Sequence, residues 1–268
     1  MYLVDKPSLD PLVTQLGNPD LQNSDTYHIH FNIRRSQSQQ RHDISLEAKY
    51  TKKPISFTYM IDLINGYRSF YPINSDYIFD ADIRYNFFTR FGHLQQFDIS
   101  STTNFHYSSN NGGYLVRMDL LNGKEHIKLN WRKDRYRIGI FAEAEVSRYL
   151  YFKNTYDNLT PYSIRYGANT VLNLPDNWSV STDLNLYTRG GYFADKLNRT
   201  DVVWNARISK SIMKGRLIFA VDGYDLLSQL SNIDYNVNGQ IRSETASNVI
   251  PSYVMLHISY RFNKKHKK

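Results

Sequence analysis

The chain has 268 residues, which is long enough for one large barrel or sandwich or for two ordinary domains. It contains no cysteine, and this excludes a disulfide-stapled domain and any thiolate-based metal or redox site. The net charge is +8, yet lysines and arginines stand singly among acidic residues and form no basic patch, so we expect no nucleic-acid partner. Apolar residues never continue for the roughly 18 positions that a membrane-spanning helix requires.

Alternation of apolar and polar residues with a period of two dominates the chain and predicts about twelve β-strands, because successive side chains of a strand point to opposite faces. In chain order, the clearest runs are 43–50, 77–87, 136–147, 178–187, 202–209 and 256–262. A helix would place Glu143 and Glu145 among the apolar positions of their run, so helical periodicity does not explain it. Several runs continue for about ten residues, the length that a tilted strand needs to cross a bilayer.

The connections between the strands are expected to alternate between short and long. We expect short turns at 52–54, 89–92, 133–134, 175–177 and 214–215. Longer polar stretches lie between them, at 65–75, 108–123, 152–161, 191–199 and 225–251. Outer-membrane barrels have short turns at the periplasmic end and longer loops at the outer end. The predicted fold is therefore an all-β, antiparallel, up-and-down transmembrane β-barrel.

Charged residues of these runs occupy the polar phase, which would face a water-filled lumen in such a barrel. The candidate lumen-lining residues are Asp80, Asp82, Arg84, Arg137, Glu143, Glu145, Asp183 and Arg207. For each of them the competing interpretation is cross-strand charge pairing that only stabilises the wall, worth roughly 0.2–1 kcal/mol per pair.

The sequence predicts no catalytic residue, no metal ligand and no cofactor. His28 and His30 lie two residues apart on one expected strand face, but no third ligand with zinc-type spacing can be identified. His257 and Ser259 also share a face, yet a hydrolase needs a nucleophile, a base and an orienting group in contact, and no third member is evident. We therefore expect polar lining residues and not an enzyme.

Three segments carry a family resemblance. The first is LGNPDL at 16–21, which resembles a turn that precedes a barrel strand. The second, 204–227, resembles a penultimate hairpin with the exit sequence GYDLL, after which Ser228 replaces the usual Asn. The third, 251–262, resembles a last strand whose terminal aromatic residues, here Tyr260 and Phe262, serve as a signal for the barrel-assembly machinery. In this order they resemble the C-terminal barrel of Bacteroidetes TonB-dependent receptors, the outer membrane β-barrel families that include SusC-like transporters.

The resemblance implies a receptor in the cell outer membrane, in contact with its lipid, that imports an unknown small ligand; TonB and a surface lipoprotein would be further partners of the full receptor. Barrels of that family have 22 strands, so this chain would supply roughly half of one, without the plug domain. The start of the chain lacks the basic and apolar regions of a signal peptide, which agrees with an incomplete receptor. Residues 1–23 are expected to form a loop or turn segment, 24–262 the barrel region and 263–268 a basic periplasmic tail.

Two other interpretations stay open. A self-contained small outer-membrane barrel, acting as a passive pore or a structural protein, would close on itself. A secreted, soluble all-β binding module would have the same alternation with its apolar face inside. The residues after Phe262 are a departure from the family pattern, because they remove the assembly signal from the end of the chain.

Overall fold

The computed structural model describes residues 13–61, 66–111, 117–152, 157–193, 195–229, 233–238, 241–246, 250 and 252–262. These residues form strands joined by turns, loops and single turns of 3-10 helix, with no α-helix in the described ranges. None of the helical segments in this part of the chain has the length and apolar character required to cross a membrane. The predicted all-β class is confirmed.

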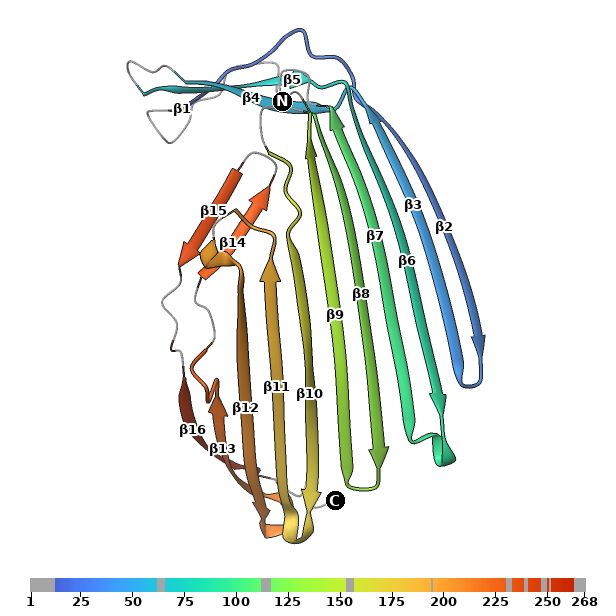
Figure 1. Cartoon of the computed structure of the whole chain (residues 1–268), viewed down its shortest axis with the longest axis vertical. Helices are drawn as coiled ribbons and strands as arrows, with labels where there is room; N and C mark the ends of the chain where they lie inside the picture. The colour runs from blue at the N-terminus through green and yellow to red at the C-terminus, as the bar shows by residue number, and fades with distance from the viewer. Residues whose placement is uncertain are drawn as a thin grey trace, which may run out of the picture.

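A large antiparallel sheet of 11 strands makes up most of the molecule and curves into an open trough (Figure 1). Its strands, in chain order, are β2 (Asp25–Gln37), β3 (Gln40–Lys52), β6 (Tyr77–Phe91), β7 (Phe97–Asn111), β8 (Met118–Lys133), β9 (Tyr136–Tyr151), β10 (Tyr162–Leu174), β11 (Trp178–Gly190), β12 (Arg199–Ile212), β13 (Leu217–Tyr224) and β16 (Tyr253–Tyr260). Each strand pairs with the next in this order, so the sheet is up-and-down as predicted. Strands β2 and β16 form its two open edges.

The two ends of the sheet differ in how they connect the strands (Figure 1). At one end, called here the turn end, the connections are short: 38–39, 92–96, 134–135, 175–177 and 213–216. At the opposite end, called the loop end, the chain makes longer excursions. Several short turns contain a non-glycine residue with left-handed backbone, for example Asp134 (φ 48°), Asp176 (φ 56°) and Lys214 (φ 56°). The predicted alternation of short and long connections is therefore present.

Several predicted connections are wrong in detail. Most of 65–75 is strand (Arg68–Asn74), and 89–91 belong to β6, whose turn follows at 92–96. The segment 52–54 lies at the loop end, and the turn of the first hairpin is formed by Ser38 and Gln39 instead. Most of the polar stretch 108–123 is strand, because β7 continues to Asn111 and β8 begins at Met118. At 52–54 and at 108–123, polar residues at the end of a strand could not be distinguished from a loop by their sequence pattern.

A smaller sheet crosses the loop end (Figure 1), and the first of the three family-like motifs, 16–21, directly follows its first strand. Strand β1 (Val13–Gln15) runs parallel to β5 (Arg68–Asn74), which pairs in turn with β4 (Ile55–Ile61). The Asn18 side chain donates a hydrogen bond to the Pro72 carbonyl over 2.8 Å, and its own oxygen accepts one from the Asp20 backbone N–H. The motif thus closes an Asx-type turn against β5. A separate hairpin joins β14 (Ile233–Asn238) to β15 (Ile241–Ala246).

The two faces of the large sheet are inverted relative to a soluble protein. Apolar side chains of alternate positions are exposed, as in Ile83 (47% exposed) and Ile140 (51% exposed). Among the described residues the buried aliphatic side chains are Leu159, Leu197, Val203 and Ala220, and Pro72 is also fully buried. The buried polar ones are Asp43, Ser75, Asp98, Ser109, Asp119, Asp201, Asp222 and Asp225. Soluble domains bury aliphatic residues and rarely bury aspartate, so this distribution has the opposite sense.

The polar side chains lie on the inner side of the curved sheet. In β9 and β10 the exposed positions are mainly apolar, whereas most of the polar positions between them are half-buried. Side chains on the concave side of a sheet converge and shield one another, while those on the convex side spread apart. We therefore call the concave side the polar face and the convex side the apolar face.

Candidate functional site

All eight candidate lining residues lie on the polar face, because they share the phase that the cross-strand register aligns there. They do not form one cluster. Asp80, Asp82 and Arg84 lie on β6; Arg137, Glu143 and Glu145 on β9; Asp183 on β11 and Arg207 on β12. The polar face is the candidate functional surface, and its side chains belong to local networks on neighbouring strands.

The candidates on β6 each have a partner on β7. The Ser108 hydroxyl donates a hydrogen bond to Asp80 over 2.7 Å. Asp82 lies 2.8 Å from Nδ1 of His106. The guanidinium Nε of Arg84 donates to the side-chain amide oxygen of Asn104 on β7 over 3.0 Å. These contacts follow the cross-strand register, so they stabilise the β6–β7 pair whatever else the side chains do.

The acidic candidates on β9 form a denser network with β8. Nζ of Lys124 lies 3.2 Å from Glu143 and 3.4 Å from Glu145. His126 Nδ1 lies 3.3 Å from the second oxygen of Glu143. The Asn122 amide donates to Glu145 over 3.0 Å. Two carboxylates therefore share one lysine, and a water-lined inner face would leave all of these groups hydrated on one side.

The candidate nearest the C-terminus, Arg207, pairs with an aspartate that sequence analysis did not single out. Asp222 on β13 is 3% exposed and lies 3.4 Å from Nη1 of Arg207. His257 Nε2 lies 2.7 Å from the same carboxylate, at an angle too bent for a hydrogen bond. The sequence alternation does place Asp222 on the polar face of its strand, but it does not indicate which side chains contact it. Its partners lie 15 and 35 residues away, at positions 207 and 257.

The histidines singled out in the sequence belong to separate contacts in the described part of the chain. Asp222 contacts His257, but Ser259 has no described hydrogen bond to that imidazole and lies opposite Ile218 of the neighbouring strand. His28 pairs with a glutamate, Glu47, over 2.9 Å. No group of three histidine or acidic side chains that could hold a metal ion occurs among the residues whose positions are described.

An aromatic contact on the polar face was also missed by sequence analysis. The Arg165 guanidinium lies between the rings of Phe141 (5.0 Å to its centroid) and Tyr187 (5.7 Å). Gly167 makes room for the first ring, because a Cβ there would lie 3.1 Å from Phe141 and 2.3 Å from the carbonyl oxygen of Leu184. The guanidinium is thus within cation–π distance of two rings on the inner side of β10.

Aromatic side chains line both ends of the apolar face. At the loop end, the rings of Tyr27 and Tyr50 are 6.4 Å apart, and those of Tyr50 and Tyr77 are 6.1 Å apart. At the turn end, Phe91 and Phe97 stack at 5.4 Å. Aromatic girdles at two levels that flank an aliphatic band are typical of membrane-facing barrel surfaces.

Glu125 is an exception on the apolar face. It lies near the middle of β8, in register with Thr103 and Ala144, and none of the alternating runs used for the prediction included it. The Ser101 hydroxyl donates a hydrogen bond to one oxygen of Glu125 over 2.6 Å, and Thr103 donates to the other. The carboxylate is thus solvated by two hydroxyl groups of the neighbouring strand.

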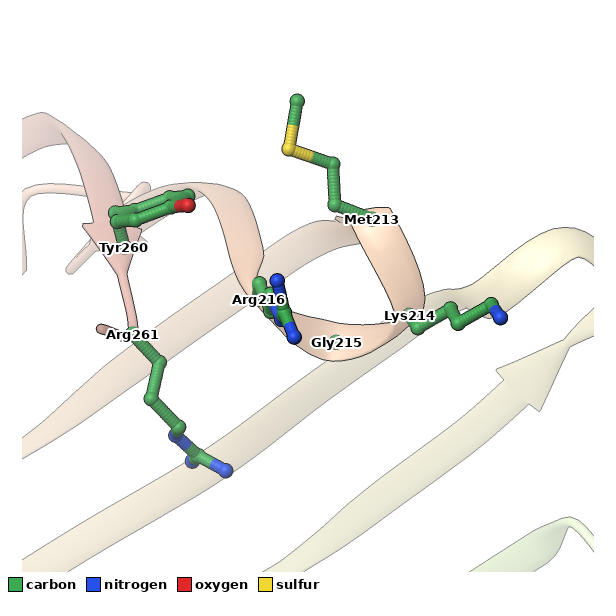
Figure 2. Close-up of a pocket in the computed structure, with 6 residues that line it drawn as sticks. All are labelled: Met213, Lys214, Gly215, Arg216, Tyr260 and Arg261. Carbon is green, nitrogen blue, oxygen red and sulfur yellow. The ribbon is translucent and has the colours of Figure 1, made fainter. Parts of the chain in front are cut away.

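Tyr260, one of the two proposed assembly-signal residues, lines a hollow at the turn end (Figure 2). It lies beside the β12–β13 turn, and the carbonyl of Arg216 in that turn accepts a hydrogen bond from the backbone N–H of Arg261, just after β16, over 2.8 Å. Its ring meets that of Phe262 edge-on, with centroids 4.5 Å apart, and Phe262 is 87% exposed. The expected basic tail, 263–268, lies outside the described residues.

Comparison with known proteins found no match: no protein family, no curated protein and no solved structure is detectably similar to this chain.

Proposed function

We propose that this chain forms part of the wall of an outer-membrane β-barrel of the TonB-dependent receptor type. The observation that carries the proposal is the inverted sheet, with an exposed apolar face outside and a charged, hydrogen-bonded face inside. Soluble proteins rarely expose a contiguous apolar patch larger than a few hundred Å². In lipid the same surface is favourable, and the polar face would line a hydrated interior.

The open edges favour a larger barrel over closure of these eleven strands on themselves. Strands β2 and β16 both run from the loop end to the turn end, so pairing them directly would make a parallel seam. Bacterial single-chain barrels contain even numbers of antiparallel strands. An antiparallel wall needs an odd number of further strands between the two edges. Lipid does not tolerate unpaired edges, so such strands would have to be present.

Import of a small ligand is the activity that the resemblance implies for the complete receptor. The polar face would then supply lumen-lining side chains, including the eight candidates, and the loop end would face the cell exterior. The plug domain and the contact with TonB would belong to other parts of the receptor. Tyr260 and Phe262 would present their aromatic side chains to the assembly machinery from the last strand of the sheet.

The test is an immunoblot of fractionated envelopes from the source organism, with an antibody raised against this chain. We expect a heat-modifiable outer-membrane band much larger than the 31.5 kDa of the chain. A band of the chain's own mass in that fraction would support the self-contained pore or structural barrel and overturn the receptor proposal. A band in the soluble fraction would overturn the membrane location and favour the secreted binding module.

A further inference from the structure

The turn end carries unpaired positive charge beside exposed aromatic and thioether side chains. The hollow there is lined by Met213, Lys214, Gly215, Arg216, Tyr260 and Arg261. None of its three cationic side chains has an ion-pair partner among the described residues. The acid in the adjacent turn, Asp176, offers its backbone carbonyl to Lys210.

Among the connecting residues of the turn end, net positive charge is concentrated at this position, although Arg132, Lys133, Arg135 and Arg137 also lie in or beside the β8–β9 turn. The connections 38–39 and 92–96 contain no lysine, arginine or acid, and 134–135 carries one charge of each sign. The turn 213–216 adds two positive charges, and Arg261 adds a third beside it. The sequence then continues with four lysines, at 264, 265, 267 and 268. Charge therefore accumulates where the last two strands of the sheet reach the turn end.

The surroundings place this charge at the level of a membrane interface. Tyr260 and Met213 (61% exposed) lie on or beside the end of the apolar face. On the same face, Lys210 extends over the ring of Trp178, with Nζ 4.9 Å from the ring centroid. Aromatic rings and long cationic side chains at strand ends are characteristic of the headgroup level of a bilayer.

The cations are spread around the hollow and do not converge on one point. Figure 2 shows Arg216 and Tyr260 near one another at the hollow, while Lys214 and Arg261 extend outward on opposite sides. A single free phosphate would be held by converging donors, whereas a surface of phosphate headgroups can engage each side chain separately. Arginine is well suited to the latter, since its planar fork pairs with phosphate oxygens bidentately.

We propose that the turn end at Lys214, Arg216 and Arg261 binds the phosphate groups of anionic phospholipids in the adjacent leaflet. The inference rests on the proposed membrane location and extends it by naming a lipid class and the residues that select it. Juxtamembrane cations near an anionic surface each contribute about fivefold to binding. Removal of all three should weaken the preference for anionic lipid on the order of 10- to 100-fold.

The test inserts the full chain from urea into two kinds of vesicle, phosphatidylcholine alone and an equal mixture with phosphatidylglycerol, and measures the floated fraction as lipid is titrated. The wild type should partition more strongly into the mixture. The triple variant Lys214→Gln/Arg216→Gln/Arg261→Gln should lose that preference and still insert into phosphatidylcholine. The charge-preserving variant Lys214→Arg/Arg216→Lys/Arg261→Lys should retain it, which would exclude a purely structural effect.

A matched control removes three positive charges at the opposite end, in Lys52→Gln/Lys53→Gln/Arg68→Gln. We expect this variant to keep the preference of the wild type. Equal partitioning of the wild type into both vesicles, or equal losses in the two triple variants, would overturn the inference. Loss of the preference in inorganic phosphate, but not in chloride of equal ionic strength, would identify a free-anion pocket and also overturn it. A wild-type chain that partitions into neither vesicle would also overturn the inference, whereas the membrane location is tested separately by the envelope immunoblot.

Discussion

Ile83→Lys tests whether the apolar face contacts lipid or water. Ile83 lies close to the middle of the 15-residue strand β6, in register with Leu46 and Phe105, and 47% of it is exposed. A lysine at the lipid-facing midplane of a barrel costs about 2–4 kcal/mol. The folding equilibrium in vesicles should therefore fall roughly 30- to 1,000-fold. In water the same exposed substitution changes stability by only about 0.5 kcal/mol.

Asn86→Lys is the matched control, because it adds the same charge to the same strand on the polar face. The new ammonium would lie in register with Asp43, and the loss of the hydrogen bond from Thr102 costs about 1 kcal/mol. The assay is urea titration of the vesicle-inserted chain, read as the heat-modifiable fraction on a gel. Equal midpoint shifts for Ile83→Lys and Asn86→Lys would refute the assignment of the two faces.

Three further substitutions test particular contacts by the same titration. Gly167→Ala places a Cβ 2.3 Å from a carbonyl oxygen of β11 and should cost about 1–3 kcal/mol, whereas Gly123→Ala, with open space around it, should be nearly neutral; equal effects would contradict the close approach. Asp222→Ala removes the buried partner of Arg207 and should cost about 1–3 kcal/mol; an unchanged midpoint would show that the contact does not stabilise the fold. Asn18→Ala removes the hydrogen bond from the Asn18 side chain to the Pro72 carbonyl in the small sheet. It should speed proteolysis at the loop end without shifting the urea midpoint of the large sheet; unchanged cleavage would show that this hydrogen bond is dispensable.

Period-two alternation was sufficient to predict the large sheet and the phase of its side chains. Because the period is two, assigning one residue of a strand to a face assigns all the others. This is why the polar phase of the sequence includes both Asp80 and Arg207, which lie on strands six positions apart in the sheet order and share one face by register. The expected count of about twelve strands compares with 11 in the large sheet, and the β1–β5–β4 and β14–β15 pairings were not separated from it.

Turn positions were less predictable, because the decisive residues carry weak signals. The first hairpin turns at Ser38 and Gln39, where neither glycine nor proline is present, while the proline at position 54 marks a loop-end connection. Three turns that were located contain Asp134, Asp176 or Lys214 in a left-handed conformation. Aspartate adopts this conformation readily, which made two of these turns visible in the sequence.

Side-chain contacts between distant strands were the least predictable part of the candidate site. The ion pair of Asp222 with Arg207 depends on the register between β12 and β13, and the contact with His257 depends on the pairing with β16 across a long excursion. Glu125 illustrates the same limit, since its stabilising hydroxyl groups lie on the preceding strand. Alternation gives the face of a residue but not its neighbour.

The scarcity of buried apolar side chains has a calorimetric consequence. Unfolding of a soluble domain raises the heat capacity by about 12–15 cal/mol/K per residue, mainly because apolar surface moves from the interior into water. Here the described interior contributes little more than Leu159, Leu197, Val203 and Ala220, and the aliphatic surface already points outward. When the unfolded chain stays in contact with lipid, the heat-capacity increment per residue should fall well below that of a soluble domain. The hydrophobic free energy of this fold then comes mainly from contact between its outward-facing apolar side chains and the surrounding lipid. It therefore changes when that lipid is replaced by another medium.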